Sequence, residues 1–260
     1  MMKYKTKVLA DRLVGVLSRC PGVECVSLNE AALPDPLDPY FALILDVFYT
    51  GVIPGAAERR AWYGEDAAAF ETSGSGAKDR FLVGGLPVRI EYKSTGQIED
   101  MVSFTDTRRE SLWFLKDLGT YGFYRLVNGE ILFSRGDWIR AVQRRLREPS
   151  SEFWFRMRDA NQSKMEHFVG DLGAALFQGD DFYYLISASG FIKSACLTLF
   201  CVNRRFEPSH RAYYRQVIEL PVLPESFPAQ LETFLREGSD ITKERKYSLA
   251  QIVARGIIAL

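Results

Sequence analysis

The sequence is poor in the residues that most often build metal and redox centres. It has two histidines, His167 and His210, and four cysteines that form no Cys-x-x-Cys pair. Structural zinc sites use closely spaced cysteine and histidine ligands, so we expect none here. For the same cysteines we expect free thiols and, as the default compartment, a reducing cytoplasm.

An excess of one charge sign is also missing. The 33 lysines and arginines equal the 33 aspartates and glutamates, so the formal net charge is zero. Broad electrostatic capture of nucleic acid requires a positive excess, and its absence argues against a nucleic-acid partner. A local basic patch is compatible with this balance.

Long apolar runs are absent as well. No such run reaches the roughly 18 to 20 residues that span a bilayer. The first seven residues are basic and are followed by a short mixed segment, not by an apolar core. We therefore expect no membrane partner and no signal peptide. With 47% apolar residues, the chain can still bury the core of a globular protein.

Two strand-like apolar runs each carry one acid. Asp46 lies in the run 41–49, and Glu91 lies in the run 86–93. A buried, unpaired carboxylate is costly, so two of them in neighbouring runs indicate a shared site on one sheet. The natural partner of paired carboxylates is a divalent metal. The alternative is that each acid faces water or pairs with an arginine.

The first part of the chain predicts an α+β domain over residues 1–108. Its helical patterns have apolar residues at three- and four-residue spacing, and its strands are short and bounded by glycine or proline. The expected elements are a helix at 7–18, strands at 23–28 and 41–49, a helix at 56–62, a strand edge at 70–76, a hairpin at 78–92 that turns at Gly84-Gly85, and a helix at 97–104.

The second part predicts a mainly helical domain over residues 109–260. Asn128-Gly129 is a strong hairpin signal and predicts a hairpin at 124–133 inside this domain. The expected helices are 111–118, 137–147, 153–177, 180–202, 213–220, 228–237 and 248–258.

Three segments carry a family resemblance: Leu45–Gly51, Lys78–Phe81 with Pro87–Lys93, and Phe191–Lys193 with Leu199–Phe206. Their order resembles the nucleotidyltransferase fold of the polymerase-beta superfamily, in its minimal bacterial form with a helical C-terminal half. The resemblance implies a small mixed sheet with helices, followed by an all-helical bundle. It also implies magnesium-dependent transfer of a nucleoside monophosphate from a triphosphate to an acceptor hydroxyl.

In that superfamily the first strand ends in Gly-Ser, the second strand carries two acids at alternate positions, and a later strand carries a third acid. The resemblance places Ser27 at the serine of the Gly-Ser pair, with Val26 in place of the glycine. It assigns Asp46 and Glu91 as catalytic, metal-binding residues for Mg²⁺.

The second member of the acid pair is missing. Ile44 and Phe48 occupy the alternate positions on either side of Asp46, and Asp38 lies eight residues upstream of it in a proline-rich loop. The alternative function is therefore a catalytically impaired relative that binds a nucleotide or a protein partner. A helical interaction module with the sheet as its scaffold is a third reading.

Basic residues near the acids are candidate phosphate ligands. Arg89 and Lys93 share a strand face with Glu91, because alternate strand residues point the same way. Under the resemblance they bind a nucleoside triphosphate, together with Lys193 from the helical half; the acceptor is unknown. The alternatives are a solvated salt-bridged row on the strand and, for Lys193, a role at the end of its helix.

Overall fold

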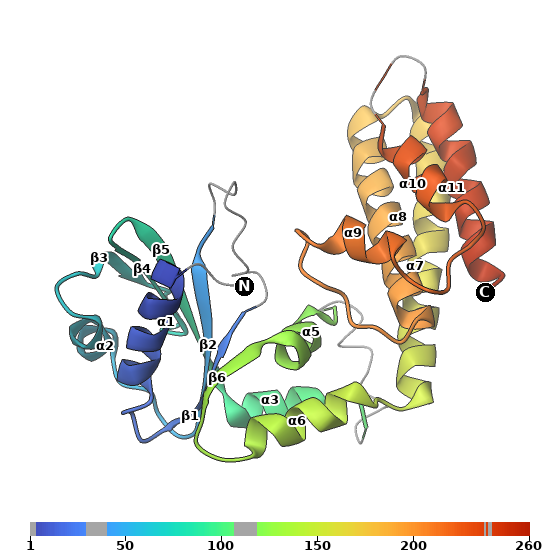
Figure 1. Ribbon diagram of the computed structural model, residues 1–260. Helices are drawn as coiled ribbons and strands as arrows, with labels where there is room; N and C mark the ends of the chain where they lie inside the picture. The colour runs from blue at the N-terminus through green and yellow to red at the C-terminus, as the bar shows by residue number, and fades with distance from the viewer. Residues whose placement is uncertain (1–3, 30–40, 107–118, 237, 239–240) are drawn as a thin grey trace. The chain divides into compact units, whose positions relative to one another are not determined.

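The computed structural model of the protein describes residues 4–29, 41–106, 119–236, 238 and 241–260. The chain forms two compact units (Figure 1). The sheet unit consists of Met1–Thr105 and Gly122–Glu148, and the helical unit of Asp106–Tyr121 and Pro149–Leu260. This division differs from the predicted ranges 1–108 and 109–260, because the segment after Gly122 returns to the sheet and adds a strand to it.

The sheet unit contains a six-stranded sheet in the order β3-β4-β5-β2-β1-β6. β2 and β5 run parallel, and the remaining neighbours are antiparallel, so the sheet is mixed. The α+β prediction is confirmed. The elements are α1 (Tyr4–Leu17), β1 (Val23–Leu28), β2 (Leu43–Tyr49), α2 (Ala56–Tyr63), β3 (Ala68–Thr72), β4 (Lys78–Val83), β5 (Leu86–Ser94), α3 (Thr95–Ser103), α5 (Tyr121–Asn128), β6 (Glu130–Ser134) and α6 (Trp138–Arg147).

One face of the sheet carries the core of this unit. Leu9, Leu13 and Leu17 recur every four residues on α1 and are buried against it. Leu45 and Val47 of β2 point toward this core, so the intervening Asp46 points to the opposite face. The alternation of side chains along β2 therefore separates the core from the candidate site.

The β4–β5 hairpin was predicted correctly from its turn. Gly84 and Gly85 have φ values of 55° and 79°, which is the left-handed backbone that a two-residue hairpin turn requires. This turn sets the register in which Lys78 lies opposite Glu91.

The hairpin predicted at 124–133 is wrong. Its first half is the helix α5, and its second half is β6, which pairs with β1 instead. Gly129 serves close packing here, since a Cβ on it would lie 3.3 Å from Ser27 Oγ and 2.8 Å from the Arg125 carbonyl oxygen. The Asn-Gly pair thus ends a helix against β1, where no side chain would fit.

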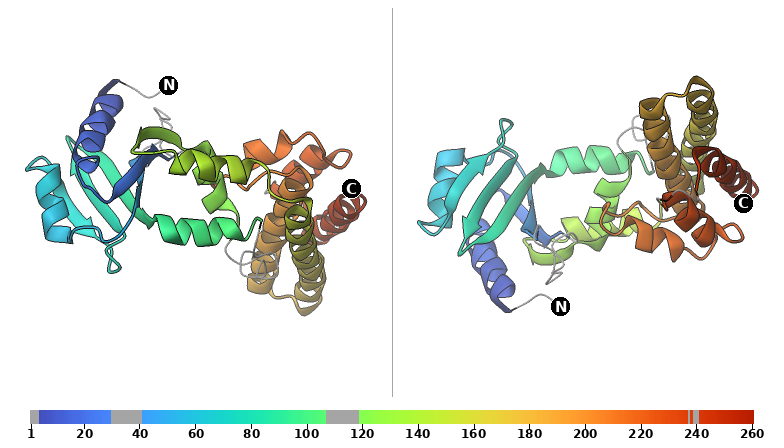
Figure 2. Two further views of the ribbon diagram at one scale, coloured as in Figure 1. Left: turned by 90° about the horizontal axis from the view of Figure 1, so that it is seen from below. Right: turned by 90° about the horizontal axis from the view of Figure 1, so that it is seen from above.

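The helical unit is built on two long helices that run side by side and antiparallel, α7 (Ser151–Gln178) and α8 (Asp181–Val202) (Figure 2). Ser150 and Asp180 accept backbone N–H bonds at their first turns, as N-cap residues do. α9 (Tyr213–Ile218), α10 (Phe227–Leu235) and α11 (Lys243–Ile258) complete it. The predicted helical character is confirmed, while the helix predicted at 111–118 lies outside the described residues.

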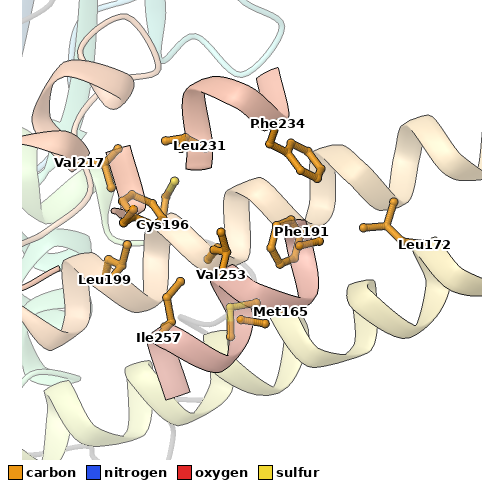
Figure 3. Packing of buried hydrophobic residues seen from close by; sticks show 14 of the residues in the cluster. Met165, Leu172, Phe191, Cys196, Leu199, Val217, Leu231, Phe234, Val253 and Ile257 are labelled. Carbon is orange, nitrogen blue, oxygen red and sulfur yellow. The ribbon is translucent and has the colours of Figure 1, made fainter. Parts of the chain in front are cut away.

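The core of the helical unit lies where α8 meets α7, α10 and α11 (Figure 3). Phe191 from α8 packs against Phe234 from α10, with ring centroids 5.6 Å apart. By length and composition alone α8 could cross a membrane, but 56% of its apolar window is buried in this unit. Its apolar character is accounted for by its central place in the core.

Candidate functional site

A row of polar residues crosses the sheet on the face opposite α1. The strand register places Ser27 beside Asp46, Asp46 beside Glu91, and Glu91 beside Lys78. Paired residues on neighbouring strands point to the same face, so four adjacent strands contribute to one site. The two acids that the sequence analysis singled out are direct neighbours.

Two cations hold both carboxylates. Arg125 reaches over from α5, and its Nε donates to Asp46 Oδ2 at 3.2 Å. Its Nη2 bonds Asp46 Oδ1 and lies 2.9 Å from Glu91 Oε2. Lys93 Nζ donates to Asp46 Oδ1 at 2.9 Å and lies 3.8 Å from Glu91 Oε2. The acids are therefore joined by a forked guanidinium and an ammonium group.

These ion pairs are largely shielded from solvent, which strengthens the electrostatic interaction between the charges. The side chains of Asp46 and Arg125 are only 2% and 13% exposed. Burial by itself would raise the pKa of Glu91, but Arg125, Lys93 and Lys78 together hold it below its usual value. Burial lowers the pKa of Lys93 although Asp46 opposes that change. At neutral pH the carboxylate of Glu91 stays charged and is neutralised by its basic neighbours.

The positions of the missing acid are closed by apolar side chains. Phe48 is 1% exposed, and its ring packs against Trp138 with centroids 5.6 Å apart. The Lys93 ammonium lies 5.9 Å from the centre of the same ring. Ile44 is half-buried and lies beside Arg89 of β5. Among the residues that the structure describes, no third carboxylate joins Asp46 and Glu91 here.

Arg89 carries an uncompensated charge. It lies on the same strand face as Glu91 and Lys93, beside Ile44 of β2. Its Nε atom is buried without a hydrogen-bond partner, and no ion pair joins Arg89 to any described residue. Buried donors are nearly always satisfied in folded proteins, so the Nε atom of Arg89 is an exception among the described residues near the two acids.

A buried network on the core face supports β4 and β5 from behind. Asp79 is fully buried and accepts two hydrogen bonds from Arg59, each 2.8 Å long. Tyr92 also donates to Asp79, at 2.9 Å, and Tyr63 does so at 3.2 Å. Because Tyr92 lies between Glu91 and Lys93 in the chain, this network fixes the strand that carries them.

The remaining predicted site residues lie in different surroundings. Ser27 is in the polar row but is 4% exposed and lies behind Gly129. Lys193 belongs to α8 of the helical unit, where its side chain is exposed. Asp38 lies outside the described residues. The structure thus brings together Asp46, Glu91, Lys93 and Arg89, with Ser27 at the side.

Comparisons with known proteins agree with this architecture. No protein-family model matches the sequence, and no curated protein matches it. A crystal structure of a nucleotidyltransferase-like protein from Exiguobacterium sibiricum is similar over 95% of this chain and 72% of that chain, with a TM-score of 0.50. The chain has a nucleotidyltransferase-like fold. The sequence identity is 14%, so the likeness carries the fold and no activity.

Nucleotidyltransferase-like folds commonly use Mg²⁺, and the residues present can be tested against that ion. Asp46 and Glu91 supply the right ligand type, but Arg125 and Lys93 already occupy their oxygens. Over the described ranges, no three acidic, histidine or cysteine side chains gather as a metal site would need. A pair of carboxylates with two bound cations does not fit Mg²⁺ in this arrangement.

Sequence reasoning missed Arg125, the residue that dominates the site. It was placed in a strand because of the Asn-Gly signal that follows it. The helical signal was present, since Phe123 and Leu126 are three residues apart and both are buried. The contact with Asp46 spans 79 residues of sequence, and no local pattern announces it.

Proposed function

We propose that the sheet unit of this nucleotidyltransferase-like fold binds a nucleotide through its phosphates, and that it does so without metal-dependent transfer. The observation that carries the proposal is the charge balance of the site. The two carboxylates of Asp46 and Glu91 face the basic groups of Arg125, Lys93 and Lys78, and Arg89 adds a fourth.

The four basic groups outnumber the two carboxylates, and this surplus of positive charge favours the binding of an anion. Arg125 is bound to both acids, so the groups left for a ligand are Arg89 and the outer sides of Lys93 and Lys78. The Lys78 side chain is 48% exposed, and its Nζ lies 3.7 Å from Glu91. The guanidinium of Arg89 and the ammonium groups of Lys93 and Lys78 lie on one face of the sheet, on β5 and the neighbouring β4, and match the oxygens of a di- or triphosphate.

Binding of ATP, GTP, CTP and UTP by isothermal titration calorimetry in the presence of EDTA tests the proposal. We expect at least one triphosphate to bind without metal. Arg89→Gln should weaken it by roughly 10- to 100-fold, the loss typical of a charge-assisted hydrogen bond. Arg19→Gln is the matched control, because Arg19 is exposed and follows α1 on the other face.

The outcomes separate binding from other roles. Equal affinity in wild type, Arg89→Gln and Arg19→Gln would place the phosphates elsewhere. Absence of binding for all four nucleotides would leave the site as a structural ion-pair cluster and end the proposal.

Magnesium-dependent nucleotidyl transfer is the second candidate, and the register that sets Asp46 beside Glu91 favours it. It requires Arg125 and Lys93 to leave the carboxylates before a metal enters. Incubation with labelled triphosphates and Mg²⁺, using Asp46→Ala as the control, decides between the two. Under our proposal the wild type transfers no label; transfer that Asp46→Ala abolishes would establish the enzyme.

A further inference from the structure

Four large apolar side chains of the helical unit lie outside its core, on both sides of the turn that joins α7 to α8. Phe177 at the end of α7 is 94% exposed, and Phe182, Leu185 and Ile186 at the start of α8 are 74%, 66% and 53% exposed. On a scale of about 200 Å² for a large apolar side chain, they leave roughly 500 Å² of apolar surface in water. Apolar surfaces of this extent often mark interaction sites.

The three exposed residues of α8 share one side of the helix. Leu185 and Ile186 follow Phe182 by three and four residues, about one helical turn, so the three side chains form a continuous strip. Tyr184 and Phe191 lie on the opposite side of the helix and belong to the core of the unit. We call Phe182, Leu185 and Ile186 the α8 strip.

The same side of α8 is covered farther along the helix. Phe200 follows Phe182 by eighteen residues, about five turns, and therefore lies on the same side. It is 1% exposed, and Tyr213 at the start of α9 packs edge-on against it with ring centroids 5.3 Å apart. The α8 strip has no such cover among the residues that the structure describes.

Charges at the two ends of the strip determine which partner fits it. Asp181 lies directly before Phe182, and its side chain is 84% exposed although it contacts Lys243 of α11. Lys193, which is exposed, follows Phe182 by eleven residues or about three turns on the same side. Ser189, between the strip and Lys193, is small and exposed. This side of α8 therefore has an acid at one end and a base at the other.

We propose that a second copy of this chain docks on the α8 strip, with the two α8 helices antiparallel across a twofold axis. A second copy presents the same surface, so one apolar strip packs against the other. Antiparallel packing sets Lys193 of each copy near Asp181 of the other, whereas parallel packing would set like charges together. Since Ser189 is small, the two helix axes can approach to the usual distance of about 8–10 Å.

The size of the surface sets the strength of the dimer. Two copies of the exposed apolar surface together bury about 1,000 Å², which is near the lower limit for a specific interface. The dimer is therefore weak and reversible, with an expected dissociation constant of roughly 1–100 μM. The α8 strip belongs to the helical unit, so this proposal does not depend on the nucleotide site proposed for the sheet unit.

Sedimentation equilibrium of the full chain, from about 1 to 500 μM, measures the dissociation constant. Phe182→Glu should weaken the dimer at least a hundredfold, because twofold symmetry removes an apolar anchor twice and puts two charges into the interface. Leu185→Glu should weaken it in the same way. Phe155→Glu is the matched control, because Phe155 of α7 is 67% exposed and lies outside the strip. All three sites are exposed, so the circular dichroism of each variant should match the wild type.

Lys193→Gln tests the antiparallel arrangement. It should weaken the dimer by about fivefold, because twofold symmetry removes two exposed ion pairs. In a parallel pair the same substitution would remove a repulsion and strengthen the dimer. The sign of the change therefore distinguishes the two arrangements.

The proposal fails if the wild type remains a monomer up to about 500 μM, above the expected dissociation constant. It also fails if Phe155→Glu weakens the dimer as much as Phe182→Glu, which would place the interface elsewhere, or if Lys193→Gln does not weaken it. Co-sedimentation of a monomer with phosphatidylcholine vesicles, abolished by Phe182→Glu, would make a lipid surface the occupant of the strip and overturn the proposal.

Discussion

Replacing Arg125 by methionine tests the central feature of the site. Methionine keeps much of the apolar stem but removes the guanidinium that joins Asp46 to Glu91. Breaking one side of a buried ion pair costs about 3–5 kcal/mol. Lys93 still contacts Asp46 at 2.9 Å, so we expect the lower end of that range, about 3 kcal/mol.

The same variant should gain an affinity that the wild type lacks. Without Arg125, the two neighbouring carboxylates face each other with Lys93 as the main remaining cation, and a divalent ion can compete for them. Mg²⁺ at about ten times its dissociation constant would then stabilise the variant by roughly 1.4 kcal/mol. The wild type should show no such stabilisation by Mg²⁺.

Amide hydrogen exchange, read by mass spectrometry on peptides from β2 and β5, measures both the loss of stability in Arg125→Met and its stabilisation by Mg²⁺, and it does so for the sheet unit alone. Arg125→Lys, which keeps a positive charge, should recover part of the loss, and Arg19→Met controls for the removal of an arginine from an exposed position. The reasoning is refuted if Arg125→Met loses no more protection than Arg19→Met, or if Mg²⁺ protects wild type and variant equally.

Three further predictions follow from buried groups. The folded pKa of Glu91 is held below its unfolded value of about 4.3, so its stabilisation is present above that pH and is lost as the pH falls through the folded pKa. Acid unfolding followed by exchange on β5 should therefore be less steep in Glu91→Gln. Asp79→Asn should destabilise the sheet unit by about 3–5 kcal/mol in urea unfolding, because Arg59 loses its buried partner; a loss below that of an exposed aspartate, Asp66→Asn, would contradict this. Gly119→Ala should lower the thermal midpoint of the helical unit, since its φ is 73° and the added Cβ would strike Glu207; Gly179→Ala in the same unit, with a φ of 67° but open space around its Cβ, is the control and should lower it less.

Local patterns were enough for most secondary structure, because they depend on residues close in sequence. Apolar spacing on α1 and α8 predicted helices, and Gly84-Gly85 predicted the β4–β5 turn, since each follows from short-range backbone and burial preferences. The same reasoning was wrong at Asn128-Gly129. Gly129 is needed because a Cβ at this position would lie 3.3 Å from Ser27 Oγ. Ser27 is 102 residues away in the sequence, so the residues around Asn128-Gly129 give no sign of this close approach.

The sequence by itself determined that two acids lie in neighbouring strand-like runs, that basic residues flank one of them, and that the acid expected beside Asp46 is replaced by Ile44 and Phe48. Only the tertiary structure decided what the acids bind. Parallel pairing of β2 and β5 set Asp46 beside Glu91, and the return of the chain through α5 brought Arg125 onto both. A carboxylate pair attracts either a metal ion or a guanidinium group. Which of the two it binds depends on which distant segment of the chain folds back over the sheet, and the local residue pattern of a strand carries no information about that.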